Sequence, residues 1–240
     1  MKKSIVLVSI ALSTALLCSC LQLHAKIADE ICELYNLREA TPKVFTKKFD
    51  GHPLNYSLLG EVVNKEGKTK KLYLIQLPSH KQRRNPKCGA HAYENCKVLS
   101  QKNLNLAKVV EILNSEKQKE KISAIKFCMR DNYQVEKRKK QDEEERGAKY
   151  NFKIVEINRT NDWSKIKPTI PGVYMIRTYQ YEHWIAVRVE ETKNGNIVIL
   201  VTDSYHPFND NRVIGPTIFA ESLIKGLGYS SFKFFPLEKR

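Results

Sequence analysis

The sequence predicts an α+β protein in which a helical N-terminal part packs on a mostly antiparallel sheet. Of its 240 residues, 42% are hydrophobic, which is enough apolar material for one sizeable core. Apolar residues recur at helical spacing in segments before residue 115, whereas strand-like runs follow one another between residues 152 and 202. Helices and strands segregated along the chain in this way are typical of an α+β arrangement.

Residues 1–25 have the pattern of a secretory signal peptide. Two lysines near the start are followed by the apolar block Ile5–Leu17, and no charge occurs before residue 26. Two processing sites fit, a lipoprotein box in which Cys20 would be lipidated and a cleavage after Ala25, and an uncleaved anchor helix is the third alternative. We therefore expect an exported chain, periplasmic or attached to a membrane as a lipoprotein, or secreted, with residues 26–240 forming one domain.

The N-terminal half of that domain combines helices with two strands. Apolar stripes and turn residues between the apolar runs define these elements. We expect a helix over residues 27–38, strands at Leu58–Val63 and Leu72–Leu77 with a turn at 65–68, and helices over 88–99 and 104–114.

Residues 134–149 form a charged insertion with almost no apolar side chains. Such a run is typical of a solvated helix or a flexible connector. The chain as a whole is basic, with 41 Lys and Arg against 26 Asp and Glu and a formal net charge of +15. A nucleic-acid arm is nevertheless disfavoured, because the basic block runs directly into acidic residues and no aromatic side chains interleave for base stacking. We expect no nucleic-acid partner.

The C-terminal part is expected to supply most of the sheet. Asn194-Gly195 lies between two apolar runs and is a strong signal for a hairpin. Pro216–Leu227 has helical spacing and ends at glycines. The expected strands are 152–157, 173–179, 183–189, 197–202 and 229–235.

Cys88 is the first candidate for chemistry. It stands where a loop is expected to become a helix, and the positive end of the helix dipole and the unpaired N–H groups there favour a reactive thiolate. Gly89 follows it and would leave room for a substrate carbonyl. Gln82, six residues before the cysteine, has a side-chain amide that can donate to an oxyanion together with the backbone N–H of Cys88.

His183 and Asp203 are candidates for the groups that assist the cysteine, which needs an imidazole as general base and then as acid. His183 begins one strand-like run and Asp203 ends the next. With the turn centred on Asn194-Gly195, the two residues lie nearly opposite each other at the open end of the hairpin. We expect the Asp203 carboxylate to accept the His183 Nδ1–H and to fix the tautomer, and Trp184 to shield the pair from water.

These residues together resemble the papain-like cysteine peptidases. The shared set is Gln82, Cys88-Gly89, His183-Trp184 and Asp203-Ser204. Two branches are most similar, the Josephin-type deubiquitinases and the ubiquitin-like-protein proteases. The Josephin motif Cys-x-x-His-x-x-x-Asn is similar to Cys88, His91 and Asn95, and the Josephin end is similar to Gly228-Tyr229-Ser230. The second branch has its residues in another chain order, whereas Josephin enzymes usually have an asparagine where this chain has Asp203.

The resemblance implies a papain-like fold and a thiol protease or isopeptidase. By the same resemblance Cys88 is the nucleophile, His183 the general base and acid, Asp203 the orienting residue and Gln82 an oxyanion donor. The implied partner is a protein or peptide substrate, with ubiquitin-like proteins as one option, and the implied enzyme is a monomer without cofactor. No metal is expected either, because the spacing of Cys88, His91 and Cys96 fits none of the usual zinc patterns.

Three alternatives stay open. A transglutaminase-like acyltransferase also has cysteine, histidine and aspartate in this order, with the last two on neighbouring strands. A peptidoglycan endopeptidase or amidase would suit a periplasmic location. The alternative from another class is a non-catalytic basic lipoprotein that binds a protein partner through its positive surface.

Overall fold

The computed structural model describes residues 26–35, 45–63, 67–82, 87–147, 150–157, 170–178, 183–204 and 235–236. The predicted signal peptide with Cys20, the predicted helix over 216–227 and residues 229–234 of the last predicted strand lie outside these residues. The elements, in chain order, are α2 (Ile27–Tyr35), β1 (Phe45–Phe49), β2 (His52–Val63), β3 (Thr69–Gln76), α3 (Cys88–Leu99), α4 (Leu106–Asn114), α5 (Glu116–Ser123), α6 (Asn132–Arg146), β4 (Phe152–Ile157), β5 (Gly172–Thr178), β6 (His183–Glu191), β7 (Ile197–Thr202) and β8 (Phe235–Pro236).

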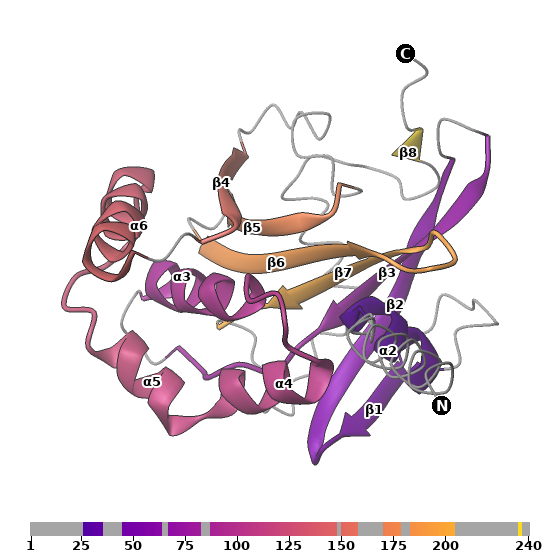
Figure 1. Cartoon of the computed structure of the whole chain (residues 1–240), viewed down its shortest axis with the longest axis horizontal. Coiled ribbons are helices and arrows are strands. Elements are labelled where there is room, and N and C mark those ends of the chain that lie inside the picture. The colour runs from indigo at the N-terminus through magenta and orange to yellow at the C-terminus, as the bar shows by residue number, and fades with distance from the viewer. Residues whose placement is uncertain are drawn as a thin grey trace, which may run out of the picture.

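The described strands form one sheet in the order β1-β2-β3-β7-β6-β5-β4, and β8 pairs with β2 off this path (Figure 1). The helix α3 lies along the sheet, with α4 and α5 beyond it and α6 near β4. The predicted α+β class is confirmed at this level.

The prediction of a mostly antiparallel sheet holds only in part, because the sheet is mixed. Pairs β1–β2, β2–β3, β5–β6 and β6–β7 are antiparallel, whereas β3–β7, β4–β5 and β2–β8 are parallel. The strand runs were predictable, but a short apolar run has the same pattern in either orientation. The parallel β3–β7 pair lies in the middle of the sheet and joins the N-terminal strands to the C-terminal ones.

The N-terminal part is also less helical than predicted, since three strands separate α2 from α3. The additional strand is β1, which turns directly into β2 through Asp50 and Gly51. Both residues have positive φ, 48° and 77°, between the closing pair Phe49 and His52. Asp-Gly is the dipeptide that such a two-residue turn prefers, so this hairpin did have a sequence signal that the prediction missed.

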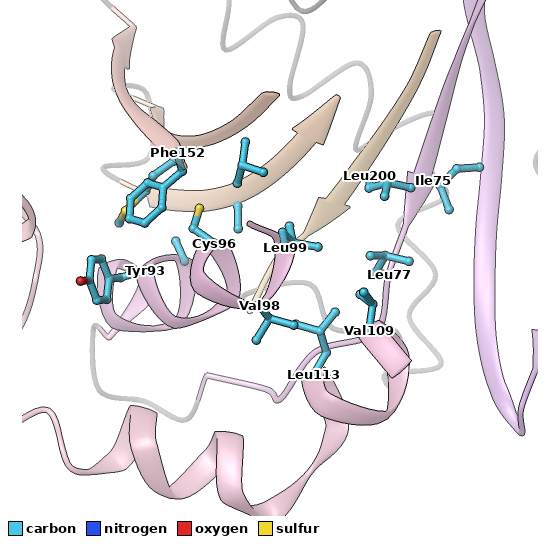
Figure 2. Close-up of a cluster of buried hydrophobic side chains, with 14 of the residues drawn as sticks. Ile75, Leu77, Tyr93, Cys96, Val98, Leu99, Val109, Leu113, Phe152 and Leu200 are labelled. Atoms are coloured by element: carbon cyan, nitrogen blue, oxygen red, sulfur yellow. The ribbon is translucent and has the colours of Figure 1, made fainter. Parts of the chain in front are cut away.

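The helix α3 is the centre of the core, and all of its residues are buried. Its side chains pack against the sheet on one side and against α4 on the other, as the labelled side chains in Figure 2 show. The sequence indicated only one buried face. The other face is covered because the polar residues on it find partners in the neighbouring helices, and buried polar groups require such partners.

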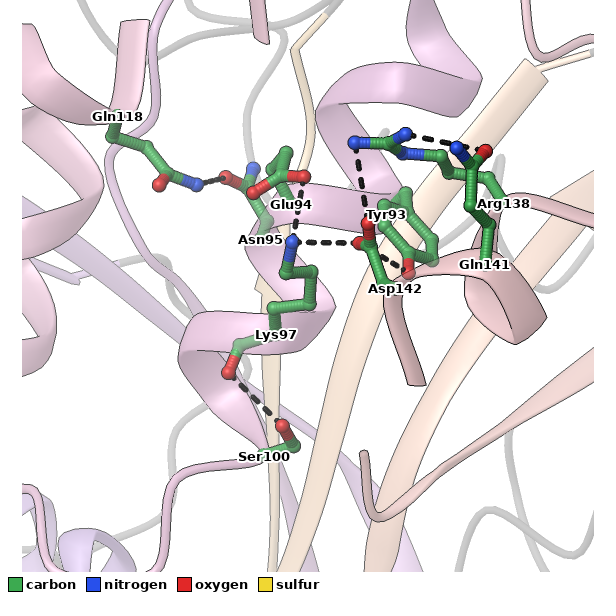
Figure 3. A network of polar contacts seen from close by, with 9 residues as sticks. All are labelled: Tyr93, Glu94, Asn95, Lys97, Ser100, Gln118, Arg138, Gln141 and Asp142. Carbon is green, nitrogen blue, oxygen red and sulfur yellow. Dashed lines mark hydrogen bonds and ion pairs between the residues drawn. The ribbon is translucent and has the colours of Figure 1, made fainter. Parts of the chain in front are cut away.

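The charged segment is helical and is attached to α3 through Asp142, which is fully buried (Figure 3). Its Oδ2 accepts hydrogen bonds from Tyr93 Oη at 2.8 Å and from Lys97 Nζ at 2.9 Å, and Arg138 Nη2 lies 3.2 Å from Oδ1. Lys97 Nζ also donates to Glu94 Oε1 at 2.9 Å. Of the two predicted alternatives, the helix is therefore correct, and it is partly buried rather than fully solvated.

The short helix α5 was not predicted. Its sequence is polar, but the Ser115 side chain accepts from the Gln118 backbone N–H and so caps its first turn.

Among the helices that the structure describes, none combines the length and the apolar composition that a membrane-spanning segment needs.

Candidate active site

The sheet topology brings the C-terminal ends of β3 and β7 and the N-terminal end of β6 together at one end of the sheet. Because β3 and β7 are parallel, the segments that follow them leave the sheet on the same side. The Leu77 N–H donates to Val201 O and the Gln82 N–H donates to Ser204 O, both at 2.8 Å. Since β6 is antiparallel to β7, its first residue, His183, lies at this same end of the sheet. Gln82, His183 and Asp203 are thus placed together by strand order and direction.

His183 and Asp203 are in direct contact, with Nε2 and Oδ1 2.7 Å apart. The observed pairing of β6 with β7 runs from Ala186–Thr202 to Glu191–Ile197, within one residue of the register that centring the turn on Asn194-Gly195 predicts. Continued past Thr202, this register sets Asp203 diagonal to His183 on the same face of the hairpin. Diagonal neighbours are within reach of side chains of this length.

The predicted contact through Nδ1 of His183 is wrong, because Asp203 lies against Nε2 rather than Nδ1. The ring is also hydrogen-bonded to the Cys88 thiol, and Nδ1 is the nitrogen left for that bond. The imidazole therefore lies between the sulfur and the carboxylate. Sequence register predicts that two residues meet, but the direction of the ring depends on the backbone and packing at the strand end.

Cys88 is the first residue of α3 and is 4% exposed. Burial raises the pKa of its thiol, but the hydrogen bond with His183, the backbone N–H groups of Trp184 and Gly89, and the nearby imidazolium charge together bring the pKa below its ordinary value. No side chain caps this end of α3 in the described residues, so a first-turn N–H is able to point at the sulfur. The expected thiolate environment at a helix start is present.

The pKa of His183 moves in the opposite direction. Burial lowers it, but hydrogen bonds with Asp203 and Cys88 and the charges of both raise the pKa to about 9. A lowered thiol pKa and a raised imidazole pKa have the same consequence. Both shifts favour the thiolate–imidazolium form of the pair over the neutral form.

Gln82 is held at this end of the sheet by a second contact with Ser204. The Ser204 hydroxyl donates to Gln82 Oε1 at 3.2 Å, in addition to the backbone bond between the two residues. This contact sets the direction of the amide, with its oxygen toward Ser204. Ser204 is a residue whose role the sequence did not indicate, although it directly follows Asp203.

Gly89 and Trp184 are both tightly packed among the described residues. A Cβ on Gly89 would lie 1.6 Å from the Met129 carbonyl oxygen, so the backbone of Met129 occupies the space directly beside this glycine. The Trp184 side chain is fully buried and its Nε1 donates to Arg130 O at 2.9 Å. The loop between α5 and α6 therefore packs directly on the start of α3. Nothing in the sequence indicated this, because the loop has no motif.

Two further ionisable groups lie near the cysteine. Burial raises the pKa of the Cys128 thiol, and the negative charge of Cys88 adds to the rise, which places this thiol close to the first. Burial, together with the positive charges of His80, Lys87 and His183, lowers the pKa of His91 to about 4. His91 is thus neutral at pH 7 and is a component of the core near the site.

The described residues contain no group of three or more His, Cys, Asp and Glu side chains that could hold a metal ion. No protein-family model, curated protein or solved structure matches the chain. The class of this protein is therefore described from its fold and from the geometry of the site. The chain is an α+β protein in which a histidine is hydrogen-bonded to both a cysteine and an aspartate, where the start of a buried helix meets the ends of two central strands.

Proposed function

We propose that this protein is an exported papain-like cysteine hydrolase that cleaves peptide or isopeptide bonds. The observation that supports it is the hydrogen-bonded order Cys88–His183–Asp203, in which the thiol pKa is lowered and the imidazole pKa is raised to about 9. Perturbed pKa values with specific charge partners are typical of catalytic sites. A structural ion pair would explain the histidine and the aspartate, but not a buried thiol beside them whose pKa is lowered.

In the proposed reaction, the Cys88 thiolate attacks the carbonyl carbon of the scissile bond and forms a tetrahedral intermediate. The His183 imidazolium gives its proton to the leaving amine, which breaks the C–N bond and leaves a thioester on Cys88. The neutral imidazole then takes a proton from water, which attacks the thioester and releases the acid. Asp203 holds the ring through Nε2 and stabilises its charged form.

The oxyanion of the intermediate is stabilised by donors on the Gln82 side of the sulfur. With Oε1 turned to Ser204, the Gln82 amide can present its NH₂ group as a donor. The backbone N–H of Cys88, at the start of α3, is the second donor. No cofactor takes part in these steps.

The substrate is a protein or peptide. The Josephin-like helix start of Cys88, His91 and Asn95 favours an isopeptide bond to a ubiquitin-like protein among the substrates to test first. The net charge of +15 favours acidic partners in general and does not select among them.

The experiment is to incubate the protein with peptide, isopeptide and peptidoglycan substrates, together with the Cys88→Ala variant and a Cys32→Ser control. We expect hydrolysis of a peptide or isopeptide by the wild type and the control, and a loss of several orders of magnitude in Cys88→Ala. Cys32 is a suitable control because burial raises the pKa of its thiol to about 11. Hydrolysis that persists in Cys88→Ala would end the assignment.

A further inference from the structure

Three buried polar side chains connect α5, α3 and β7 behind the candidate site. Asn95 Nδ2 donates to Thr202 Oγ1 at 3.1 Å, and Gln118 Nε2 donates to Asn95 Oδ1 at 3.3 Å. Figure 3 shows the second contact. Each of the three residues is at most 2% exposed. We call Gln118, Asn95 and Thr202 the polar bridge.

The polar bridge joins the two elements that hold the nucleophile and the carboxylate. Asn95 lies seven residues after Cys88, close to two helical turns, so the two side chains share one face of α3. Thr202 is the last residue of β7 and directly precedes Asp203. A movement of α3 along or around its axis would therefore change the distance of Cys88 from the His183–Asp203 pair and would break the Asn95–Thr202 bond at the same time.

Directional contacts matter here because most of the α3 surface that faces the sheet is apolar. Among the described residues, Cys96 Sγ donates to Tyr174 O on β5 at 3.4 Å and Arg188 Nη1 on β6 donates to Leu99 O at 2.7 Å, but neither bond reaches β7. Cys88, Ala92 and Cys96 on α3 and Val198 and Leu200 on β7 belong to the hydrophobic core. Apolar contacts alone tolerate small sliding and rotation, whereas a buried hydrogen bond is lost with its full desolvation penalty when the geometry changes. The polar bridge adds a directional contact between α3 and the end of β7, directly beside Asp203.

We propose that Asn95 and Thr202, supported by Gln118, are positioning residues that keep the Cys88 sulfur within hydrogen-bond reach of His183. This proposal rests on the proposed function, since it concerns the same thiolate and imidazolium. Without the Asn95–Thr202 bond, α3 gains freedom to shift, and the hydrogen bond that lowers the pKa of the Cys88 thiol weakens. The thiol then requires a higher pH to ionise.

The test measures the rate at which iodoacetamide alkylates Cys88 as a function of pH, with the modified cysteine identified by mass spectrometry. This readout needs no substrate. For folded Thr202→Val, which removes only the hydroxyl, we expect the midpoint of the profile to rise by about 1 pH unit. Thr202→Ser restores the hydroxyl and is expected to return the midpoint to that of the wild type.

The matched control is Tyr93→Phe, on the same helix. It removes a buried hydrogen bond to Asp142 and so perturbs the attachment of α6 rather than the site. We expect an unchanged midpoint in this variant even where its stability falls. A wild-type midpoint in folded Thr202→Val, or an equal rise in Tyr93→Phe, would overturn the proposal. If Thr202→Val does not fold, Gln118→Leu takes its place, with a rise supporting the proposal and a wild-type midpoint overturning it.

The two proposals fail in different ways. If the wild-type midpoint itself is not below the ordinary thiol pKa of about 8.5, the thiolate of the proposed function is absent. If the wild-type midpoint is low and stays low in Thr202→Val, only the positioning role is lost.

Discussion

At the scale of single residues, the state of His183 is set by its neighbours on both sides of the ring. The Asp203 carboxylate is 2.7 Å from Nε2 and is itself buried. Since burial alone would lower the pKa of the imidazole, the rise to about 9 depends on this carboxylate and on Cys88. The sign for stability follows from this rise. The contribution of the pair to the folded state is complete below about pH 6.5 and is lost as the pH rises through about 9.

Replacing Asp203 by Asn should lower the pKa of His183, because the amide keeps a hydrogen-bonding group but removes the negative charge. We expect a fall of about 1 to 2 pH units, the size of one hydrogen bond to a charged group. Titration of the His183 ring protons by NMR measures it. Asp131→Asn is the control, since that carboxylate caps α6 and accepts from the Gln134 N–H. If His183 titrates at the same pH in Asp203→Asn and in the wild type, Asp203 does not set its charge.

At the scale of elements, α6 shows how a charged segment becomes part of a fold. Most of its side chains are solvated, and its attachment to α3 depends on Val135 and Asp142, the two that are buried. Burial raises the pKa of the Asp142 carboxyl, but the bonds from Lys97 and Tyr93 bring the pKa below its ordinary value. Lys97 also lies over the Tyr93 and Tyr150 rings, 5.2 Å from each centroid. The ammonium is therefore well compensated in the interior.

Replacing Asp142 by Asn should lower the free energy of unfolding by about 3 kcal/mol, because it leaves Lys97 in the core with one acidic partner instead of two. Urea denaturation at neutral pH measures the change. The control is Glu144→Gln on the same helix, where an exposed pair with Lys140 at 3.8 Å contributes at most about 0.5 kcal/mol.

The pH dependence of that difference has a defined sign. Since the folded pKa of Asp142 is lowered, its contribution is present above the ordinary carboxyl pKa of 3.8 and is lost as the pH falls through the lower folded value. The stabilities of the wild type and Asp142→Asn should therefore converge in acid. A difference that stays constant down to the lowest pH at which the protein folds would show that the charge of Asp142 is not what matters.

At the scale of the whole molecule, the parallel pair β3–β7 decides that the two halves of the chain share one sheet. The residues of the two strands that pair with each other are all buried, and Leu74, Ile75 and Leu200 are among their most buried side chains. The candidate site lies at the end of this pair, where Gln82 and Ser204 continue it. We therefore expect the site to form only when β3 and β7 are paired.

Amide hydrogen exchange should show that β3 and β7 unfold together. We expect the amides of β3 and β7 to exchange together and only through global unfolding, whereas those of the edge strands β1 and β4 exchange through local opening. Exchange followed by mass spectrometry on proteolytic peptides measures these rates. Faster exchange of β3 than of β7 by several orders of magnitude would mean that the N-terminal strands form a separate folding unit.

The sequence by itself determined most of the local elements and the identity of the candidate site. Cys88 at a helix start, His183 and Asp203 at the ends of a hairpin, and the α+β class follow from spacing, turn residues and helix-end chemistry, which are local properties. Strand direction, the ring nitrogen that faces Asp203, the Met129 carbonyl against Gly89 and the polar bridge behind the site were decided only by the tertiary structure. These depend on contacts between segments far apart in the sequence, such as Leu72 and Ile197, which are 125 positions apart, and no local pattern specifies which of several apolar or polar partners will meet.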